Sequence, residues 1–394
     1  MTQPLRIAMV GTRGVPAAYG GFETAVEEIG ARLVDRGHAV TVYCRNASGE
    51  KREAWRGMDL VHLPALHLKA AETLSHTALS ASHIALTRNT DVAFVFNAAN
   101  SPLLPLLRAC GIPTALHVDG LEWMRDKWSG TGRSYYRFAE RFGVRNADAL
   151  IADAQGIADY YLGQYGAPTE LLTYGAQIVD VAASDRLAEL GLEPNGYHLV
   201  VARFEPENHV DIIVRGYQRS SSKLPLIVVG SAPYAHRHGE QITEAAAGDP
   251  RIRFLGGLWD QQLLDQLYSN AYSYLHGHSV GGTNPSLLRA MGGAAPVLAW
   301  DVGFNREVAG TEAGYFATPA QLSTLLENAE ADGAFGERGE HLRERARNTY
   351  DWDDVADGYE DLGRRIFAGE TIHARAAGHR ITIPRTRTRE QRLT

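Results

Sequence analysis

Short apolar runs alternate with longer helical patterns along this chain, and the whole alternation occurs twice. The first half contains "LRIAMV" (5–10), "DVAFVFN" (91–97) and "ALIADA" (149–154), and the second half contains "YHLVVARF" (197–204) and "APVLAWDV" (295–302). Their hydrophobicity is continuous, which is typical of strands buried on both faces of a parallel sheet. The pattern therefore predicts an α/β fold with two doubly wound, Rossmann-like domains.

A less apolar stretch at 179–196 separates the two alternations. We therefore expect an N-terminal domain over 1–178, a linker over 179–196 and a C-terminal domain over 197–350. The last residues, 371–394, hold six arginines and one glutamate with little apolar content. This composition predicts a basic, disordered tail, which could attract anionic lipid.

The size and composition of the chain are those of a globular protein with two domains. Its 394 residues exceed the roughly 250–300 residues at which single cores stop growing. A net charge of -7 argues against a nucleic-acid binder. Cys44 and Cys110 lie in separate apolar runs, so we expect buried thiols, no disulfide and no zinc site. Neither a secretory signal nor a membrane-spanning run is evident, and the protein is expected to be cytoplasmic.

The loop after the first apolar run, "GTRGVPAAYGGFET" (11–24), has four glycines and leads into a helical pattern that Gly37 ends. Backbone amides at such a helix start can hold an anion. The glycine spacing disfavours a nicotinamide site, although Arg45 after the second strand could suit a 2′-phosphate. No P-loop tripeptide occurs. A nucleotide sugar and a turn without a ligand both remain open.

Polar residues follow several other predicted strands, where ligands of doubly wound sheets bind. His117, Asp119 and Glu122 follow one strand, although a buried structural histidine is an equally good interpretation of His117. Arg203 ends the first strand of the second domain, where its guanidinium could bind a diphosphate. Pro206 is expected to begin the helix that follows.

The segment "HGHSVGGTNPSLLRAMGG" (276–293) predicts a second anion-binding helix start. Gly281 and Gly282 precede Asn284, which is a suitable helix cap, and Pro285 is suited to the first helical position. Two facing domains would then hold a diphosphate between their glycine-rich helix starts.

Several of these stretches occur together in one known family. The segments "GTRGVPAAYGGFET", "HVDGLEWMRDKW" and "HGHSVGGTNPSLL" resemble the retaining GT-B glycosyltransferases of family 4, and more narrowly the capsule-type β-1,4-rhamnosyltransferases. The segment "DWDDVADGYEDL" is similar to the C-terminal helix that crosses back to the first domain in this family, here over 352–369.

The resemblance implies transfer of rhamnose from dTDP-rhamnose, or of a sugar from a UDP-linked donor, to a cell-envelope or capsular glycan acceptor. The anomeric configuration would be retained, and neither a metal nor another cofactor would be required. The acceptor glycan could be lipid-linked, which implies peripheral membrane contact. The implied catalytic residues are Arg203, His117 and Asp119; the donor-binding residues are Gly20, Gly21, Gly282, Thr283, Asn284, Arg289 and Glu307; and the acceptor-binding residues are Arg13 and Glu122.

Three positions depart from the family pattern: Gly281 and Arg289 stand where the family has glutamates, and Asn208 stands where it has a lysine. Two further functions therefore remain open, a non-catalytic nucleotide-sugar-binding protein and a GT-B sugar-nucleotide epimerase. For Arg289, donor binding and an ion pair, for instance with Glu307, are both open.

Overall fold

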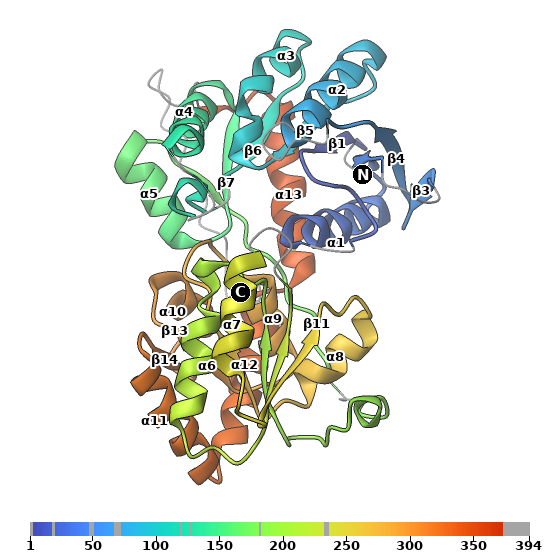
Figure 1. Cartoon of the computed structure of the whole chain (residues 1–394). Helices are drawn as coiled ribbons and strands as arrows, with labels where there is room; N and C mark the ends of the chain where they lie inside the picture. The colour runs from blue at the N-terminus through green and yellow to red at the C-terminus, as the bar shows by residue number, and fades with distance from the viewer. Residues whose placement is uncertain are drawn as a thin grey trace. The chain divides into compact units, whose positions relative to one another are not determined.

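The computed structural model (Figure 1) describes residues 3–17, 20–46, 51–66, 72–118, 120–125, 128, 130–180, 183–231 and 236–372. Asp119 and the basic tail after residue 372 lie outside these residues. The chain divides into two compact units. The first comprises Met1–Trp123, Trp128–Thr173 and Trp352–Thr394, and the second comprises Met124–Lys127 and Tyr174–Asp351.

The first unit is a doubly wound sheet whose described strands follow the order β3-β4-β2-β1-β5-β6-β7-β8. All neighbouring pairs are parallel except β3 with β4. The strands are β1 (Arg6–Val10), β2 (Ala39–Arg45), β3 (Ala54–Trp55), β4 (Met58–Leu63), β5 (Val92–Phe96), β6 (Thr114–His117), β7 (Ala149–Ala152) and β8 (Glu170–Leu171). The helices are α1 (Gly21–Asp35), α2 (Glu72–Thr87), α3 (Leu104–Ala109), α4 (Gly130–Asn146), α5 (Gln155–Tyr165) and α13 (Trp352–Phe367).

The second unit has the same topology, with the strand order β11-β10-β9-β12-β13-β14, and all its neighbouring pairs are parallel. Its strands are β9 (His198–Val201), β10 (Leu226–Val229), β11 (Ile252–Gly256), β12 (Ser273–His276), β13 (Val297–Trp300) and β14 (Gly314–Phe316). Its helices are α6 (Val210–Arg219), α7 (His236–Ala246), α8 (Gln261–Ser269), α9 (Pro285–Gly292), α10 (Gly303–Ala309), α11 (Pro319–Ala331) and α12 (Phe335–Thr349).

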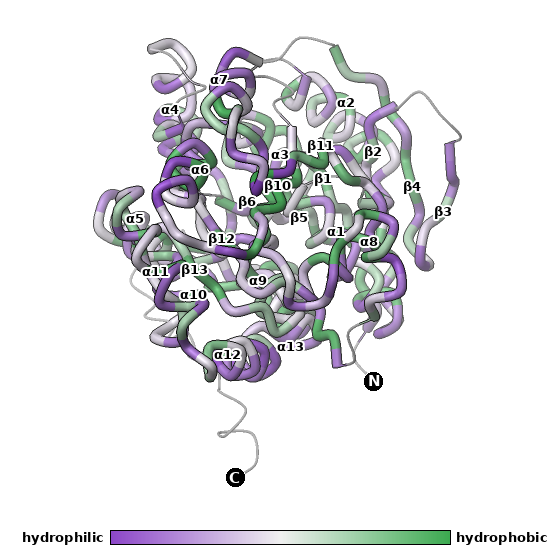
Figure 2. The backbone as a smooth tube through the Cα atoms, turned by 60° about the horizontal axis from the view of Figure 1, so that its bottom comes forward, coloured by the Kyte–Doolittle hydropathy of each residue, from purple (hydrophilic) through white to green (hydrophobic). Residues whose placement is uncertain are grey.

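The continuous apolar runs are the central strands, as the sequence predicts. Every residue of β5 and of β10 is buried, because helices cover both faces of each sheet. Figure 2 shows hydrophobic and hydrophilic segments alternating along the chain, as amphipathic helices require. In each unit the chain reverses its winding direction beside the first strand, between β1 and β5 and between β9 and β12. Ligands of doubly wound sheets bind at the carboxyl ends of these strands.

The helix expected over 352–369 is α13, which belongs to the first unit. The ring of Tyr359 on α13 contacts Phe94 of β5 at 5.0 Å between centroids. Arg32 and Arg36 of α1 form ion pairs of 2.8 Å with Asp353 and Asp357 on α13. The C-terminal helix thus covers the first sheet together with α1.

Candidate functional site

Arg203 follows β9, at the point where the second sheet reverses its winding. Its backbone carbonyl accepts hydrogen bonds from the Asn208 side chain and the Glu205 amide, both at 2.8 Å. Pro206 opens only a 3-10 turn, Pro206–Asn208, and the α-helix begins at Val210, contrary to the prediction of a helix from Pro206. Asn208, which stands in place of the family's lysine, is 2 % exposed and shapes this turn.

The loop after β12 packs directly against the loop after β9. A Cβ atom on Gly277 would lie 2.1 Å from the carbonyl oxygen of Asn208, so only glycine permits this approach. The Ser279 amide donates to the Glu207 carbonyl at 2.9 Å, and the His209 ring lies 2.9 Å from the Gly277 carbonyl. The two loops at the winding reversal are therefore held together by backbone contacts.

The predicted cap of α9 is confirmed. The Asn284 side-chain oxygen accepts from the Ser286 amide at 3.0 Å and from the Ser286 hydroxyl at 2.7 Å, and Pro285 is the first helical residue. Gly282 and Thr283 immediately before the cap are buried. The positive end of the α9 dipole thus follows the loop that packs against the turn bearing Arg203.

Two histidines that sequence reasoning did not single out lie behind this helix start. The His276 and His278 rings stack at 4.4 Å between centroids, and the Tyr274 hydroxyl bridges His276 Nδ1 at 3.2 Å and the Ser286 hydroxyl at 3.0 Å. Burial lowers the pKa of His276 to about 3. Burial, with His276 and Arg203 nearby, also holds the pKa of His278 well below its usual value. Both rings are therefore neutral near pH 7.

A third loop at the carboxyl ends of the strands of the second sheet follows β13. Trp300 stacks on His209 at 3.7 Å between centroids, and the Asn305 side chain donates to the carbonyls of Trp300 and His278 at 2.9 Å. The Glu307 carbonyl on α10 accepts from Arg345 at 2.8 Å. Loop β13–α10 is thereby fixed to the loop after β12.

The Arg289 guanidinium packs against α8. It does not extend along α9 toward the carboxyl ends of the strands. Its Nε donates to Asp265 at 2.7 Å, and its terminal nitrogens donate to the side chain and the carbonyl of Gln261, both at 2.9 Å. The guanidinium also lies 5.5 Å from the Tyr268 ring centre. Of the two alternatives for Arg289, the structure shows an ion pair, but its partner is Asp265 and not Glu307, the example named from the sequence.

In the first unit, the glycine-rich loop connects β1 to α1. Gly20 caps α1 with φ 114°, in the region that favours glycine, and a Cβ there would meet the Glu23 carboxylate at 2.2 Å. Glu23 turns back and accepts from the Arg13 amide at 3.0 Å, and Arg13 itself is exposed. The sequence predicts a helix only after residue 24, but α1 already begins at Gly21, inside the glycine-rich stretch.

His117 ends β6 and is 2 % exposed. Its ring stacks on Phe96 and meets the edge of Phe22 on α1, with centroids 5.6 and 5.1 Å apart, so the start of α1 and His117 lie together. Burial lowers the pKa of His117 to about 3. Glu122, 7 % exposed, accepts from the Trp128 indole at 3.2 Å.

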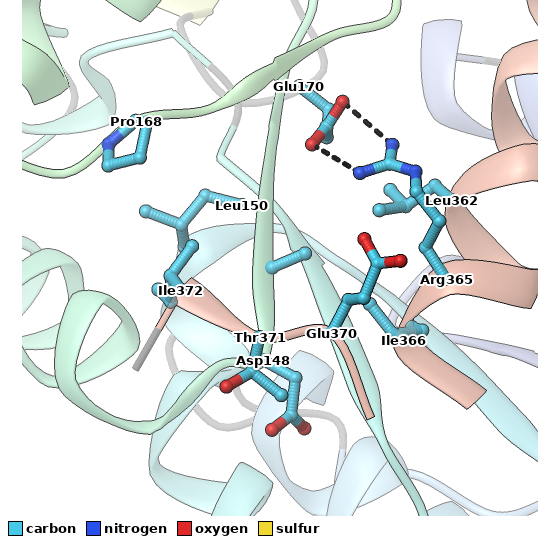
Figure 3. A pocket seen from close by; sticks show the side chains of 11 residues that line it. Asp148, Leu150, Pro168, Glu170, Leu362, Arg365, Ile366, Glu370, Thr371 and Ile372 are labelled. Atoms are coloured by element: carbon cyan, nitrogen blue, oxygen red, sulfur yellow. Dashed lines mark hydrogen bonds and ion pairs between the residues drawn. The ribbon is translucent and has the colours of Figure 1, made fainter. Parts of the chain in front are cut away.

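A pocket in the first unit (Figure 3) lies near the amino ends of β7 and β8, whereas His117 stands at the carboxyl end of β6. Asp148 immediately precedes β7 and Glu170 begins β8, so these residues mark the amino ends of the strands. Glu170 binds Arg365 of α13 at 3.0 and 2.9 Å, and the Ile372 amide donates to the Asp148 carbonyl at 2.8 Å. This pocket is where the end of α13 packs, and no predicted site residue lines it.

Within the described part of the chain, no three histidine, cysteine, aspartate or glutamate side chains gather as metal ligands. Among the same residues, no helix has the length and apolar character needed to span a bilayer.

Comparison with solved structures identifies the fold of the chain. The fold is that of the GT-B glycosyltransferases: sucrose-phosphate synthase from Thermosynechococcus elongatus superposes with a TM-score of 0.78 at 20% identity, covering 93% of this chain and 100% of that one. HepE from Anabaena in complex with UDP-glucose superposes with a TM-score of 0.71 at 15% identity, covering 91% and 100%.

The family models assign the two units separately. Residues 196–331 match "Glycosyl transferases group 1", and residues 5–177 match a "Domain of unknown function (DUF1972)". Alpha-maltose-1-phosphate synthase of Mycolicibacterium smegmatis (strain ATCC 700084 / mc(2)155) is 24% identical over 404 residues, covering 92% of this chain and 100% of that protein. The match to the group 1 glycosyl transferases thus lies within the second unit.

Proposed function

We propose that the protein transfers a sugar from a nucleoside-diphosphate donor, dTDP-rhamnose, to a cell-envelope or capsular glycan, with retention of the anomeric configuration. The second unit supplies most of the donor site, and Arg13 and Glu122 of the first unit bind the acceptor. The observation that supports donor binding most directly is the pairing of Arg203 with the α9 start on neighbouring strands, β9 and β12. A guanidinium and a helix start are both suited to phosphate oxygens.

In this proposal the diphosphate meets the backbone of Gly282, Thr283 and Asn284 first, because the Asn284 side chain already occupies the Ser286 amide. The acceptor hydroxyl oxygen bonds to the anomeric carbon as the bond from that carbon to the diphosphate breaks. The departing diphosphate takes the hydroxyl proton. Arg203 stabilises the charge that develops on the diphosphate, so neither a protein nucleophile nor a metal ion is required.

The first unit supplies a second group of proposed contacts. Gly20 and Gly21 approach the diphosphate, and His117 contacts the donor sugar. A neutral His117 can donate or accept one hydrogen bond to a sugar hydroxyl without adding charge to the site. Asp119 and Glu307 remain proposed site residues on the strength of the family resemblance.

We expect dTDP and dTDP-rhamnose to raise the melting temperature of the full chain, whereas dTMP, which lacks the distal phosphate, should raise it far less. A ligand at 100 times its dissociation constant adds about 2.7 kcal/mol of stability to the state that binds it. Differential scanning fluorimetry with dTDP, UDP, GDP and their sugars measures the effect and ranks the donors. If no diphosphate shifts the melting temperature, the proposed donor site is wrong.

Turnover separates the proposed function from the two alternatives. Release of nucleoside diphosphate that depends on an added glycan acceptor supports transfer. Saturable donor binding without turnover on lipid-linked or free glycans would instead indicate a binding protein. Conversion of one nucleotide sugar into another without any acceptor would indicate an epimerase.

Arg289→Ala should lower the stability of the second unit and leave donor affinity within about twofold of the wild type. The substitution leaves the partly buried Asp265 without its cation and removes the bonds to Gln261, at a cost of about 1–2 kcal/mol. Arg306→Ala is the matched control, because its ion pair with Asp301 is more exposed. A roughly tenfold weaker donor affinity at unchanged melting temperature would show that Arg289 binds the donor.

A further inference from the structure

Arg125 lies between β6 and α4 in the sequence, but the segment that contains it, Met124–Lys127, belongs to the second unit. Its guanidinium nitrogen Nη1 lies 3.5 Å from Oε1 of Glu207, a residue of the 3-10 turn that follows Arg203. The Arg125 side chain is 18% exposed, so part of it is accessible to a ligand. Neither Arg125 nor Glu207 is among the residues predicted from the sequence to bind the donor or the acceptor.

Arg125 and Arg203 lie near the same loop of the second unit. Burial holds the pKa of His278 well below its usual value, and the positive charges of Arg203 and Arg125 lower it further. Glu207, the partner of Arg125, is joined to the loop after β12, because its carbonyl accepts from the Ser279 amide at 2.9 Å and from the Ser279 hydroxyl at 3.0 Å. Both guanidinium groups therefore lie near the loop that leads into α9.

The turn that bears Arg203 has a negative formal charge without a second cation. Glu205 and Glu207 are 6% and 5% exposed, so two buried carboxylates accompany the single guanidinium of Arg203. A nucleoside diphosphate carries negative charge on both phosphates, and a turn with a net negative charge would repel it. Arg125 brings the formal charge of this group to zero, with two arginines against two glutamates.

The ion pair between Arg125 and Glu207 is a weak structural contact. Its separation of 3.5 Å exceeds the roughly 2.7–2.9 Å of a charge-assisted hydrogen bond. The other carboxylate oxygen, Glu207 Oε2, is buried and has no hydrogen-bond partner among the described residues. Burial of a carboxylate is unfavourable unless its hydrogen bonds are satisfied. The pair therefore contributes little to the stability of the second unit, which favours a role in ligand binding.

We propose that Arg125 provides a second cation for the donor diphosphate, in addition to Arg203, and that Glu207 neutralises Arg125 before the donor binds. This inference rests on the proposed function, because it requires a nucleoside-diphosphate donor at the start of α9. When the donor binds, the Arg125 guanidinium turns from Glu207 to the phosphate oxygens, which it can bind through two parallel N–H donors. Glu207 is a positioning residue, since it holds the guanidinium near the donor site.

The test is isothermal titration calorimetry of the full chain with dTDP and with UDP. The double variant Arg125→Ala/Glu207→Gln keeps the net charge of the wild type and leaves no unpaired charge at position 207. We expect it to raise the dissociation constant roughly tenfold to a hundredfold, the usual range for loss of a charge-assisted hydrogen bond. Glu207→Gln alone should bind the nucleotide at least as tightly as the wild type, because it removes only the opposing charge. Arg125→Lys should have an intermediate dissociation constant.

The control variant is Asp211→Asn/Arg215→Ala, which removes an ion pair of the same charges from α6 of the second unit and should bind like the wild type. If the wild type binds neither dTDP nor UDP, the proposed function is wrong and this inference with it. If the wild type binds a nucleotide and Arg125→Ala/Glu207→Gln binds it equally well, only the inference about Arg125 is wrong. Equal weakening by Glu207→Gln alone would also overturn the inference, since the ion pair would then act by shaping the turn.

Discussion

Arg203→Ala is expected to lower the turnover number by about 10²- to 10³-fold, the usual loss when one preorganised donor to a developing negative charge is removed. The arginine follows β9 beside the α9 start, where the proposed diphosphate gains charge as the sugar leaves. The Michaelis constant for the donor should change less than the turnover number, because the strongest interaction forms only as that charge develops. Steady-state kinetics of diphosphate release measures both constants.

The Arg203→Ala substitution keeps two backbone-directed hydrogen bonds of the turn. The hydrogen bonds that shape the turn go to the Arg203 carbonyl, from Asn208 and Glu205, and an alanine retains that carbonyl. Arg203→Lys keeps the positive charge but lacks the planar guanidinium with its paired donors. It should therefore have a turnover number between those of Arg203→Ala and the wild type. Arg215→Ala, on the exposed face of α6, controls for loss of one arginine from the same unit. If Arg203→Ala retained wild-type turnover, the proposed charge stabilisation would be wrong.

The central strands could be predicted because burial on both faces leaves a continuous apolar run in the sequence. No continuous apolar run marks the strands β3, β8 and β14, which have two or three residues and lie at sheet edges. An edge strand of this length has too few residues to show any period. Short-range pattern also predicted the cap of α9 correctly, since that cap depends on residues within one turn.

Contacts between distant residues could not be predicted from the pattern. Within the linker predicted over 179–196, Leu187 and Leu192 are buried and the Asn195 amide donates to the Asn270 carbonyl at 2.8 Å. Arg289 binds Asp265 through a separate helix, and nothing in the local spacing of α9 indicates that partner. The paired histidines at 276 and 278 did have a signal, two histidines directly at the end of a buried strand.

The buried histidines predict that the protein loses stability between pH 7 and pH 5. His117 in the first unit and His276 in the second have pKa values lowered to about 3 by burial, against about 6.5 in an unfolded chain. As the pH falls below 6.5, the unfolded chain binds protons that the folded units exclude, so unfolding becomes more favourable. Each histidine removes about 1.4 kcal/mol per pH unit, or about 2 kcal/mol at pH 5.

Carboxylates titrate mainly below this range, so the histidine contribution can be isolated by urea unfolding at pH 7 and at pH 5. His276→Phe should reduce the stability difference between the two pH values by about 2 kcal/mol for the second unit, because phenylalanine keeps a ring stacked on His278 but binds no proton. His117→Phe should do the same for the first unit, where Phe96 and Phe22 surround the ring. An undiminished pH difference in His276→Phe and His117→Phe would mean that both rings take up a proton in the folded protein as the pH falls to 5, which would contradict their lowered pKa values.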